Sequence, residues 1–414
     1  MQQMAEVQED VDQQDLQYLV SDAVWNHVEV QDHLVRDADR LLGGHEDSML
    51  LLDESAFGKK GKKSAGVSRQ WNGRLGKVDN CQVGVFGALC RGTAAVLVQA
   101  RLYLPKCWTE DPKRCEEAHI PEDQRTFQSK SQIALGIVKR ARANGARFVW
   151  VGADAGYGKE PQYLRELGDS DERFMVNVHK TQRFFEEDPK PFLPTVIAGK
   201  GRPPKRLTTK ATSVSVEMWA KSQPETAWTT VDVRHSTMGL IRVQAMRRTA
   251  WIWDHEEPTA RRWTVLVVRE LGLDGKTSYA LSNAAEDLPL QQLVQAERQR
   301  FWIEQAFRDA KSELGLADYQ ARNWNCWHRH MTLCMMAQLF TVETRLQEVE
   351  TIPMLSVRDI RTALAHLLAN PGSTDLKVFQ NIANRQRQRW ESTRKRYEKQ
   401  GVPPTWTGFG NPIM

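Results

Sequence analysis

The stretch SMLLLDESAF, residues 48–57, decides how the chain is expected to fold. Four consecutive apolar residues run into the carboxylates Asp53 and Glu54, and a short apolar run of this kind indicates a fully buried strand. Neighbouring side chains on an extended strand point to opposite sides, so Asp53 and Glu54 should diverge. The strand is therefore expected to carry one carboxylate on each face of a sheet.

Two further strands are expected shortly after this stretch. They are the apolar runs CQVGVFGALC (81–90) and AAVLVQARLYLP (94–105). The three residues between them, Arg91-Gly92-Thr93, suit the turn of a hairpin.

Two helices and two more strands complete the pattern. The helix is SKSQIALGIVKRARANG (129–145), which has Gly145 as its stop, and the strand RFVWVGADAGYG (147–158) ends on Asp154. A short helix near PQYLRELG and the strand RFMVNVHK follow. Three strands, then helix, strand, helix and strand predict an α/β layer with a mixed sheet. Asp53 and Asp154 would lie at strand ends, where such sheets bind ligands.

Changes in composition divide the chain into five expected parts. A linker rich in Pro, Gly and Lys precedes alternating stretches such as Val231-Asp232-Val233, which indicate a separate β-rich module. The parts are an N-terminal helical segment (1–44), a first part of the sheet domain (45–181), the β-rich insertion (182–284), a second part with a long helix (285–345) and a basic, helical C-terminal region (346–414).

The composition, 41% hydrophobic and 26% charged residues, is that of an ordinary globular protein. No run of 18 apolar residues exists, and the acidic, glutamine-rich N-terminus does not resemble a signal peptide, which predicts a cytoplasmic protein without membrane association. The six cysteines have no C-x2-C spacing and are expected to be reduced, structural thiols.

Charge is distributed unevenly along the chain. Residues 1–50 contain twelve acidic and two basic side chains, a net charge of −10, which leaves +15 for the remainder of a chain whose total is +5. Basic clusters lie around residues 59–77, 200–210 and 385–399, and fourteen tryptophans are interspersed. Such clusters favour a polyanion partner, and indole rings can stack on bases, although a charge run can also be a solvated face.

The helical stretch RQRFWIEQAFRDAKSELG, residues 298–315, places three charges on one side. At about 100° per residue, Arg300, Glu304 and Lys311 fall within about 40° of one another. They lie on the shoulder of an apolar seam, which is made by the following four residues: Ile303, Phe307, Ala310 and Leu314. A helix-edge ion pair would also explain Arg300 and Glu304.

Asp53, Asp154 and Glu304 would together suit a divalent metal site. Mg²⁺ prefers oxygen ligands, and two ions about 4 Å apart can hold the attacking and the leaving oxygen of a phosphodiester. Three clustered carboxylates would repel one another without cations. Arg300 and Lys311 would then hold DNA phosphates beside the metals.

Several long motifs resemble those of DDE-type bacterial insertion-sequence transposases, whose catalytic domain is ribonuclease H-like. They are LLDESAFGKKGKKSAGVSRQW, GRLGKVDNCQVGVF, RLYLPKCW, FVWVGADAGYG, WIEQAFRDAKSELGLADYQARNW and WHRHMTL, which together span about residues 45–345. Arg300, Glu304 and Lys311 match the spacing of the Y-(2)-R-(3)-E-(6)-K signature, but Glu297 replaces its tyrosine. The implied fold is a ribonuclease H-like mixed sheet flanked by helices, interrupted by the β-rich insertion, with helical N- and C-terminal segments.

The resemblance implies an activity, its cofactors and its partners. Asp53, Asp154 and Glu304 would be the catalytic metal ligands for two Mg²⁺ ions, which Mn²⁺ can replace, in DNA cleavage and strand transfer. The partners would be double-stranded DNA, as element ends and target, and a second copy of the chain in a homodimer on paired ends, in a nucleoid-associated location. The expected DNA-binding residues are Arg300, Lys311, Lys59, Lys60, Lys62, Lys63, Arg69, Arg322, His328 and Arg329.

Two pairs of residues each allow two interpretations. His328 and His330 diverge by about 200° on a helix, so His328 is expected to pack or to contact phosphate rather than to bind metal. Trp251 and Trp253 should face one side of a strand, either as a core pair or as a stacking surface for an unpaired base.

Two alternatives to a transposase remain open. One is a ribonuclease H-like nuclease that cuts DNA without strand transfer, and the other is a non-catalytic, transposase-derived DNA-binding protein. A strand-transfer assay on pre-cleaved ends distinguishes the first alternative from a transposase. The presence of Asp53, Asp154 and Glu304 argues against the second alternative.

Overall fold

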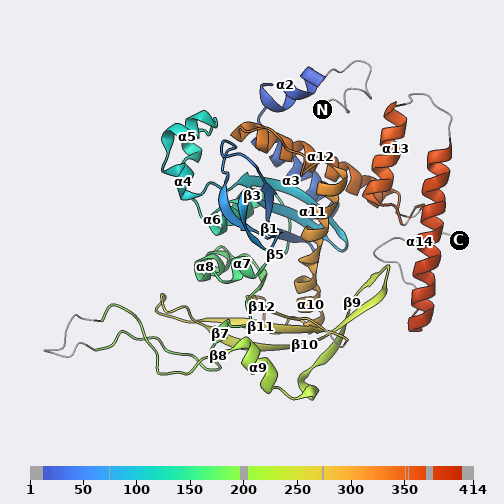
Figure 1. The fold of residues 1–414 in the computed structure, drawn as a ribbon. Coiled ribbons are helices and arrows are strands. Elements are labelled where there is room, and N and C mark those ends of the chain that lie inside the picture. Colours follow the sequence, from blue (N-terminus) through green and yellow to red (C-terminus); the bar gives the residue numbers. More distant parts are fainter. Residues whose placement is uncertain are drawn as a thin grey trace. The chain divides into compact units, whose positions relative to one another are not determined.

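The chain forms two compact units, and each is interrupted in the sequence. The computed structural model describes residues 13–73, 75–195, 204–272, 275–349, 351–352, 354–369 and 376–402 (Figure 1). The first unit comprises Met1–Phe148, His235–Leu240 and Phe301–Met414, and the second comprises Val149–Arg234 and Ile241–Arg300. Within the described ranges, no helix combines the length and the apolar character needed to cross a bilayer.

The first unit is built on four antiparallel strands. They are β1 (Met49–Gly58), β2 (Ser68–Asn72), β3 (Lys77–Arg91) and β4 (Ala94–Leu102). The long strand β3 pairs with each of the other three. Gly92, in the turn between β3 and β4, has φ +56°, a conformation that glycine adopts without strain. The strands predicted at residues 48–57, 81–90 and 94–105 are confirmed, but the expected position of Asp53 at a strand end is wrong, because β1 continues to Gly58.

Helices surround these strands in the first unit. They are α2 (Gln13–Ser21), α3 (His27–Leu42), α4 (Lys106–Thr109), α5 (Pro112–Glu117), α6 (Lys130–Ala143), α11 (Phe301–Glu313), α12 (Trp324–Gln347), α13 (Val357–Ala369) and α14 (Lys377–Gln400), with a 3-10 turn at Glu122–Gln124. Asn26 caps α3, because its side chain accepts the backbone N–H of Val28 at 2.9 Å.

Glutamine side chains complete the hydrogen bonding of strand β4. The backbone N–H of Ala100 donates to Gln31 of α3, and that of Leu97 donates to Gln338 of α12 at 2.9 Å. Gln338 also donates to the backbone oxygen of Ala306 in α11. Because unpaired backbone groups of a strand are costly to bury, these two glutamines dock α3, α11 and α12 against β4.

The second unit contains a mixed sheet and a short two-stranded sheet. The main strands are β5 (Trp150–Ala153), β6 (Phe174–Asn177), β9 (Thr229–Ser236), β10 (Gly239–Ile252), β11 (Arg261–Glu270) and β12 (Thr277–Ser282). β5 and β6 are parallel, whereas the pairs β6–β12, β12–β11 and β11–β10 are antiparallel. The short sheet pairs β7 (Arg183–Phe184) with β8 (Val214–Ser215).

Four helices lie in the described part of the second unit, and they complete a mixed α/β architecture. They are α7 (Ala155–Gly158), α8 (Pro161–Asp169), α9 (Val216–Ser222) and α10 (Leu290–Gln299), with a 3-10 turn at Glu225–Ala227. Strands β7 to β12 all fall within residues 183–282, so the predicted β-rich stretch is rich in strands. The predicted fold class, a mixed α/β fold with helical segments near both ends, is confirmed.

The single helix expected over residues 298–315 is wrong in one respect. Arg300 separates α10 from α11, although its dihedral angles, φ −53° and ψ −31°, remain in the α region. The interruption is therefore a break in the helical hydrogen bonding rather than a sharp turn. Gly315, two residues after the end of α11, has φ +76°, a conformation that favours glycine at the end of a helix.

A buried carboxylate joins α13 to α14, which lie side by side (Figure 1). Asp359 in α13 is fully buried, and its oxygens accept hydrogen bonds from Arg385 at 3.0 Å and Arg389 at 2.5 Å, both in α14. Gln386 and Ser356 donate to the same carboxylate. Burial alone would raise the pKa of Asp359, but the hydrogen bonds from Ser356 and Arg389 lower it overall.

Asp359→Ala is expected to lower the free energy of unfolding by about 2–3 kcal/mol. Removing one member of a buried ion pair usually costs more, but both arginines are more than one third exposed and keep much of their hydration. Urea denaturation checks this value. Glu398→Ala is the matched control, because Glu398 pairs only at the surface of α14 and its loss should cost at most about 0.5 kcal/mol.

The pH dependence follows from the lowered pKa of Asp359. A carboxylate with a depressed folded-state pKa stabilises the fold above its unfolded pKa, and it loses that contribution as the pH falls through the folded value. The difference in stability between the native chain and Asp359→Ala should therefore be constant near neutral pH and shrink below about pH 4. Equal denaturation midpoints for Asp359→Ala and Glu398→Ala at pH 7 would contradict the assigned role.

Candidate active site

The carboxylates of Asp53 and Glu54 lie on opposite faces of strand β1. Asp53 is half-buried and stands opposite Phe86 of β3 in the antiparallel register, so the two side chains share a face. One oxygen of Asp53 accepts the backbone N–H of Glu54 at 2.7 Å. Glu54 points the other way and forms an ion pair with Lys130 of α6. The predicted divergence of Asp53 and Glu54 is confirmed.

Helix α11 covers the sheet face that carries Asp53. The ring of Phe86 packs edge-on against Phe307 of α11, with 5.1 Å between ring centroids. Ile303, Phe307 and Ala310 are buried, as the sequence predicted for the apolar seam, whereas Glu304 is exposed. Because Glu304 lies one turn before Phe307, Asp53 and Glu304 belong to the same side of the sheet in the first unit.

A close aromatic contact fixes this face of β3. Gly84 stands opposite Ser55 of β1, and a Cβ atom added to Gly84 would come within 2.7 Å of the rings of both Phe86 and Trp327. Real Cβ atoms do not approach ring atoms so closely, and only glycine leaves room for Trp327 of α12 here. The strand that opposes Asp53 is therefore held between aromatic side chains.

Asp154 follows strand β5 in the second unit and begins a tight helical turn. It is the N-cap of α7, where its Oδ1 accepts the backbone N–H groups of Gly156 at 2.8 Å and Tyr157 at 3.3 Å. Gly158 ends this turn against β6, and an added Cβ would lie 2.0 Å from the backbone oxygen of Asn177. The glycine-containing turn thus keeps the backbone of Asp154 close to the end of β6.

Glu297 occupies a buried position on α10 of the second unit. Its side chain accepts a hydrogen bond from Asn177 of β6 at 3.0 Å, and its other oxygen lies 3.2 Å from the guanidinium of Arg298. Glu297 is 6% exposed. Glu297, which replaces the tyrosine of the signature, therefore contacts the end of β6 in the same unit.

The three expected metal ligands come from two units. Asp53 and Glu304 belong to the first unit and Asp154 to the second. None of the three is fully buried, and carboxylate oxygens are the donors that Mg²⁺ takes, so the residue types fit a hydrated divalent ion. Among the residues that the structure describes, no three His, Cys, Asp or Glu side chains stand together in an arrangement that would hold a metal.

A basic groove of about 810 Å³ lies in the first unit, beyond the end of β1. Its charged side chains are all cations and come from three segments of the chain. They are Lys59, Lys60, Lys62, Lys63, Lys311 and Arg322. No acidic residue belongs to its described lining. Six of the ten residues expected to contact DNA are thus brought together.

Hydrogen bonds hold the lysine-rich loop against the segment that precedes α12. The ammonium of Lys59 donates to the backbone oxygen of Tyr319 at 2.6 Å and lies 4.6 Å from the centre of its ring. The backbone N–H of Ala65 donates to the backbone oxygen of Arg322 at 2.8 Å. Burial lowers the pKa of Lys59. Lys59 therefore anchors the loop, while Lys60, Lys62 and Lys63 are exposed.

Lys311 connects the groove to helix α11. Its ammonium lies 5.5 Å from the ring centre of Phe57 in β1 and 5.7 Å from that of Phe307. Phe57 follows Asp53 by four residues on the same strand and therefore shares its face. A cation on α11 thus lies between the basic groove and the sheet face of Asp53.

The remaining residues expected to contact DNA lie elsewhere. Arg69 is exposed on β2 but does not line the basic groove, and Arg300 is at the break between α10 and α11. His328 is 2% exposed and accepts the backbone N–H of Leu102, which fits the packing role that the sequence left open. Arg329 is buried and donates to the backbone oxygen of Ser21 at 2.8 Å. The buried positions of His328 and Arg329 do not fit a DNA contact.

A signal for the burial of His328 was present in the sequence. Helix α12 has apolar residues on all sides, and a helix of this kind is expected to be enclosed by its neighbours. His328 stacks on His27 of α3, with 4.7 Å between ring centroids. Desolvation keeps the pKa of His328 low, so it remains neutral.

Trp251 and Trp253, both in the second unit, have different surroundings. Trp253 is 7% exposed, and its indole N–H donates to the backbone oxygen of Glu257 at 2.8 Å. Trp251 is half-buried and exchanges two backbone hydrogen bonds with Phe185. A core role therefore fits Trp253, which lies just beyond the end of β10.

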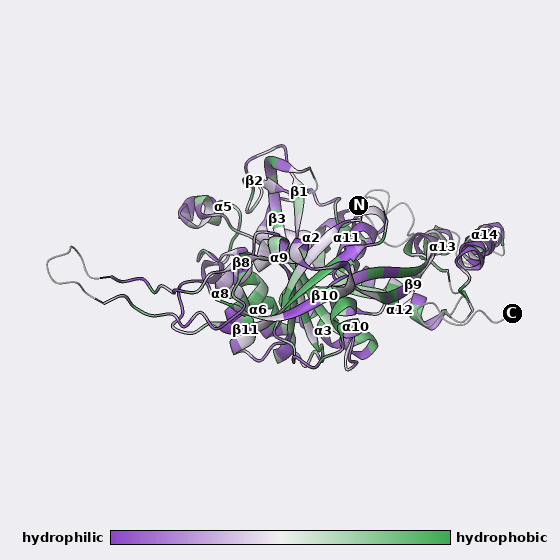
Figure 2. Cartoon of the chain, turned by 90° about the horizontal axis from the view of Figure 1, so that it is seen from below, coloured by the Kyte–Doolittle hydropathy of each residue, from purple (hydrophilic) through white to green (hydrophobic). Residues whose placement is uncertain are grey.

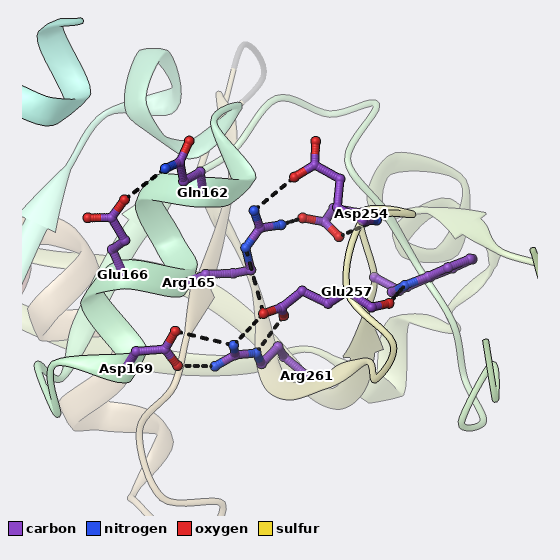
Figure 3. Close-up of polar contacts among 9 residues, drawn as sticks. Gln162, Arg165, Glu166, Asp169, Asp254, Glu257 and Arg261 are labelled. Atoms are coloured by element: carbon purple, nitrogen blue, oxygen red, sulfur yellow. Dashed lines mark hydrogen bonds and ion pairs between the residues drawn. The ribbon is translucent and has the colours of Figure 1, made fainter. Parts of the chain in front are cut away.

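Ion pairs fix the segment that follows Trp253 (Figure 3). Arg165 of α8 pairs with Asp254, and Arg261 pairs with Asp169 at 2.6 Å and with Glu257 at 2.8 Å. Two arginines thus lie between carboxylates from α8 and from the connection between β10 and β11. This network ties the connection beside Trp253 to α8.

Comparison with known proteins identifies the family. The family model described as DDE superfamily endonuclease matches residues 1–240, more than half of the chain. The matched region includes Asp53 and Asp154, and Glu304 lies beyond it. This chain belongs to the DDE superfamily endonucleases.

Two individual proteins give narrower matches. The chain is 34% identical over 113 residues to a probable transposase for insertion sequence element IS701 from Microchaete diplosiphon. This match covers 27% of the chain and only 26% of that relative's length. The NurA nuclease from Sulfolobus solfataricus aligns over 72% of this chain and 92% of its own, with 9% identity and a TM-score of 0.28, which is too low to indicate a common fold.

Proposed function

We propose that this chain is a transposase that binds the terminal inverted repeats of an insertion sequence and catalyses DNA strand cleavage and strand transfer. One observation carries the proposal. The basic groove brings Lys60, Lys62 and Lys63 together with Lys311, which lies on the helix that also carries Glu304. A cationic groove beside a carboxylate-bearing sheet face suits a DNA strand whose phosphodiester must reach those carboxylates.

Each group has a distinct role in the proposed reaction. Asp53, Asp154 and Glu304 would hold two Mg²⁺ ions, which Mn²⁺ can replace. When bound, such ions supply an activated water and stabilise the leaving oxygen of the phosphodiester. Lys311 and Arg300 neutralise phosphate charge next to the scissile bond, and the basic groove positions the strand.

Strand transfer also sets requirements on the assembly. After cleavage, the freed 3′-hydroxyl attacks a phosphodiester of target DNA, so one P–O bond forms while another breaks. Two element ends must be held together, which two copies of the chain on paired ends would do. A nucleoid-associated location would follow from this DNA binding.

A strand-transfer assay tests the proposal. The substrate is a duplex from the DNA that flanks the gene, pre-cleaved to carry a 3′-hydroxyl and mixed with a plasmid target and Mg²⁺ or Mn²⁺. Joined products are expected, and a matched duplex ending in a 3′-dideoxynucleotide should give none.

Two results would overturn the proposed function. Cleavage of intact ends without any joining would favour a nuclease of the ribonuclease H-like type. Retention of the duplex in a gel shift, with neither cleavage nor joining in either metal, would favour a non-catalytic DNA-binding protein.

A further inference from the structure

Helix α14 has one face that is fixed within the first unit. Ile382, Thr393 and Tyr397 are buried on this face, and Arg385 and Arg389 reach Asp359 of α13. The helix also contacts the tip of the hairpin between β9 and β10, which belongs to the same unit. There the guanidinium of Arg396 donates to the backbone oxygen of Thr237 at 2.6 Å, and the Tyr397 hydroxyl donates to that of Ser236 at 3.2 Å.

The opposite face of α14 is exposed and carries two kinds of side chain. In its first half the exposed residues include Gln380, Asn384, Arg387 and Gln388, and in its second half Arg394, Lys395 and Lys399. At about 100° per residue, all seven fall within an arc of about 140°. Figure 2 shows α14 drawn largely in the hydrophilic colour.

We propose that this outer face of α14 binds duplex DNA in the major groove, and this inference rests on the proposed function. Its first half presents carboxamide and guanidinium groups, which read base edges in that groove, and its second half presents cations for phosphates. The helix has 24 residues and is therefore about 36 Å long, close to one turn of duplex DNA.

Two carboxylates on the same face provide a further test of the proposal. Glu398 pairs with Arg394 at 3.4 Å, and Glu391 is exposed between the two halves. A carboxylate next to a DNA backbone repels phosphate, so the face binds DNA in spite of Glu391. Removing that charge should therefore tighten binding, an effect opposite to that of removing a cation.

Phosphate contact by the second half is tested by the salt dependence of binding. The full-length chain is mixed with a duplex from the DNA flanking the gene, without divalent ions, so that binding is measured without cleavage. Lys395→Gln/Lys399→Gln should reduce the slope of log affinity against log salt by about 1.8, or about 0.9 per contact. The matched control, Lys113→Gln/Lys139→Gln, removes two exposed lysines of the first unit and should leave the slope unchanged.

Base reading by the first half is tested by sequence preference. Asn384→Ala/Gln388→Ala should keep the salt slope and reduce the preference for flanking DNA over scrambled DNA by about 5- to 100-fold. Glu391→Gln should increase affinity for both duplexes. Urea denaturation of each variant confirms that α14 remains folded.

The outcomes separate this proposal from the proposed function. If Lys395→Gln/Lys399→Gln has the slope of its control while substitutions in the basic groove lower the slope, α14 does not bind DNA and the proposed function stands. If the native chain itself shows no preference for flanking DNA, both proposals fail. A lower slope for Lys395→Gln/Lys399→Gln, together with tighter binding by Glu391→Gln, establishes the contact between α14 and DNA.

Discussion

Replacing Asp53, Asp154 or Glu304 with alanine is expected to abolish DNA cleavage while DNA binding persists. Each side chain is proposed to be a ligand of the divalent ions. Such ions stabilise the charge that develops in the transition state, and this stabilisation amounts to several kcal/mol. A loss of this size corresponds to a rate lower by about 10³-fold or more. Binding depends instead on the cations of the basic groove, so affinity measured by gel shift should change little.

The neighbouring carboxylates provide matched controls for this prediction. Glu54 follows Asp53 directly but faces α6 and pairs with Lys130, and Glu313 at the end of α11 pairs with Arg361 at 3.2 Å. Glu54→Ala and Glu313→Ala should cleave DNA within a few-fold of the native rate. Normal cleavage by any two of the three ligand variants would refute the assignment.

Local patterns in the sequence were sufficient to predict much of the fold. The run at residues 48–57 forms β1, in which four consecutive apolar residues are buried, and the alternation of the strand places Asp53 and Glu54 on different faces. The 100° projection likewise identified the buried side of α11. Both features depend on residues that are close together in the chain.

Long-range contacts account for what the sequence did not predict. Glu297 accepts its hydrogen bond from Asn177, 120 residues away, so its position could not be inferred from the signature spacing. The anchoring of Lys59 by Tyr319 spans 260 residues. The sequence left packing and phosphate contact open for His328, and the contact with His27 of α3, 301 residues away, decides for packing.

The helical periodicity of residues 298–315 is correct, but it did not predict the break in the helix at Arg300. The dihedral angles of Arg300 remain in the α region that the projection assumed, yet this residue lies between two helices in the sequence and is the last residue of the second unit. The sequence has neither Gly nor Pro at this point, so it carried no signal for the interruption.

Removing the three exposed lysines of the basic groove is expected to produce the second large effect. Lys60→Gln/Lys62→Gln/Lys63→Gln should lower the slope of log affinity against log salt by about 2.7 and weaken binding at 0.1 M salt by about 10²-fold. The reason is counterion release, since each lysine that neutralises a phosphate frees about one bound cation. Fluorescence anisotropy over a salt series measures both quantities.

Lys59 and Lys311 make this second prediction more specific. Lys311→Gln should lower the slope by about 0.9, because its ammonium lies at the groove over the rings of Phe57 and Phe307. Lys59 instead donates to the backbone oxygen of Tyr319, and its burial lowers its pKa, so Lys59→Gln should weaken binding by loosening the loop.

A matched triple variant decides between a DNA contact and a merely solvated lysine cluster. Lys106→Gln/Lys113→Gln/Lys139→Gln removes three exposed charges from the same unit outside the groove. If net charge alone governed binding, both triple variants would lower the slope equally. A slope that falls only for the groove variant requires phosphates to sit against Lys60, Lys62 and Lys63, and a groove variant with an unchanged slope would leave the lysine cluster as a solvated face.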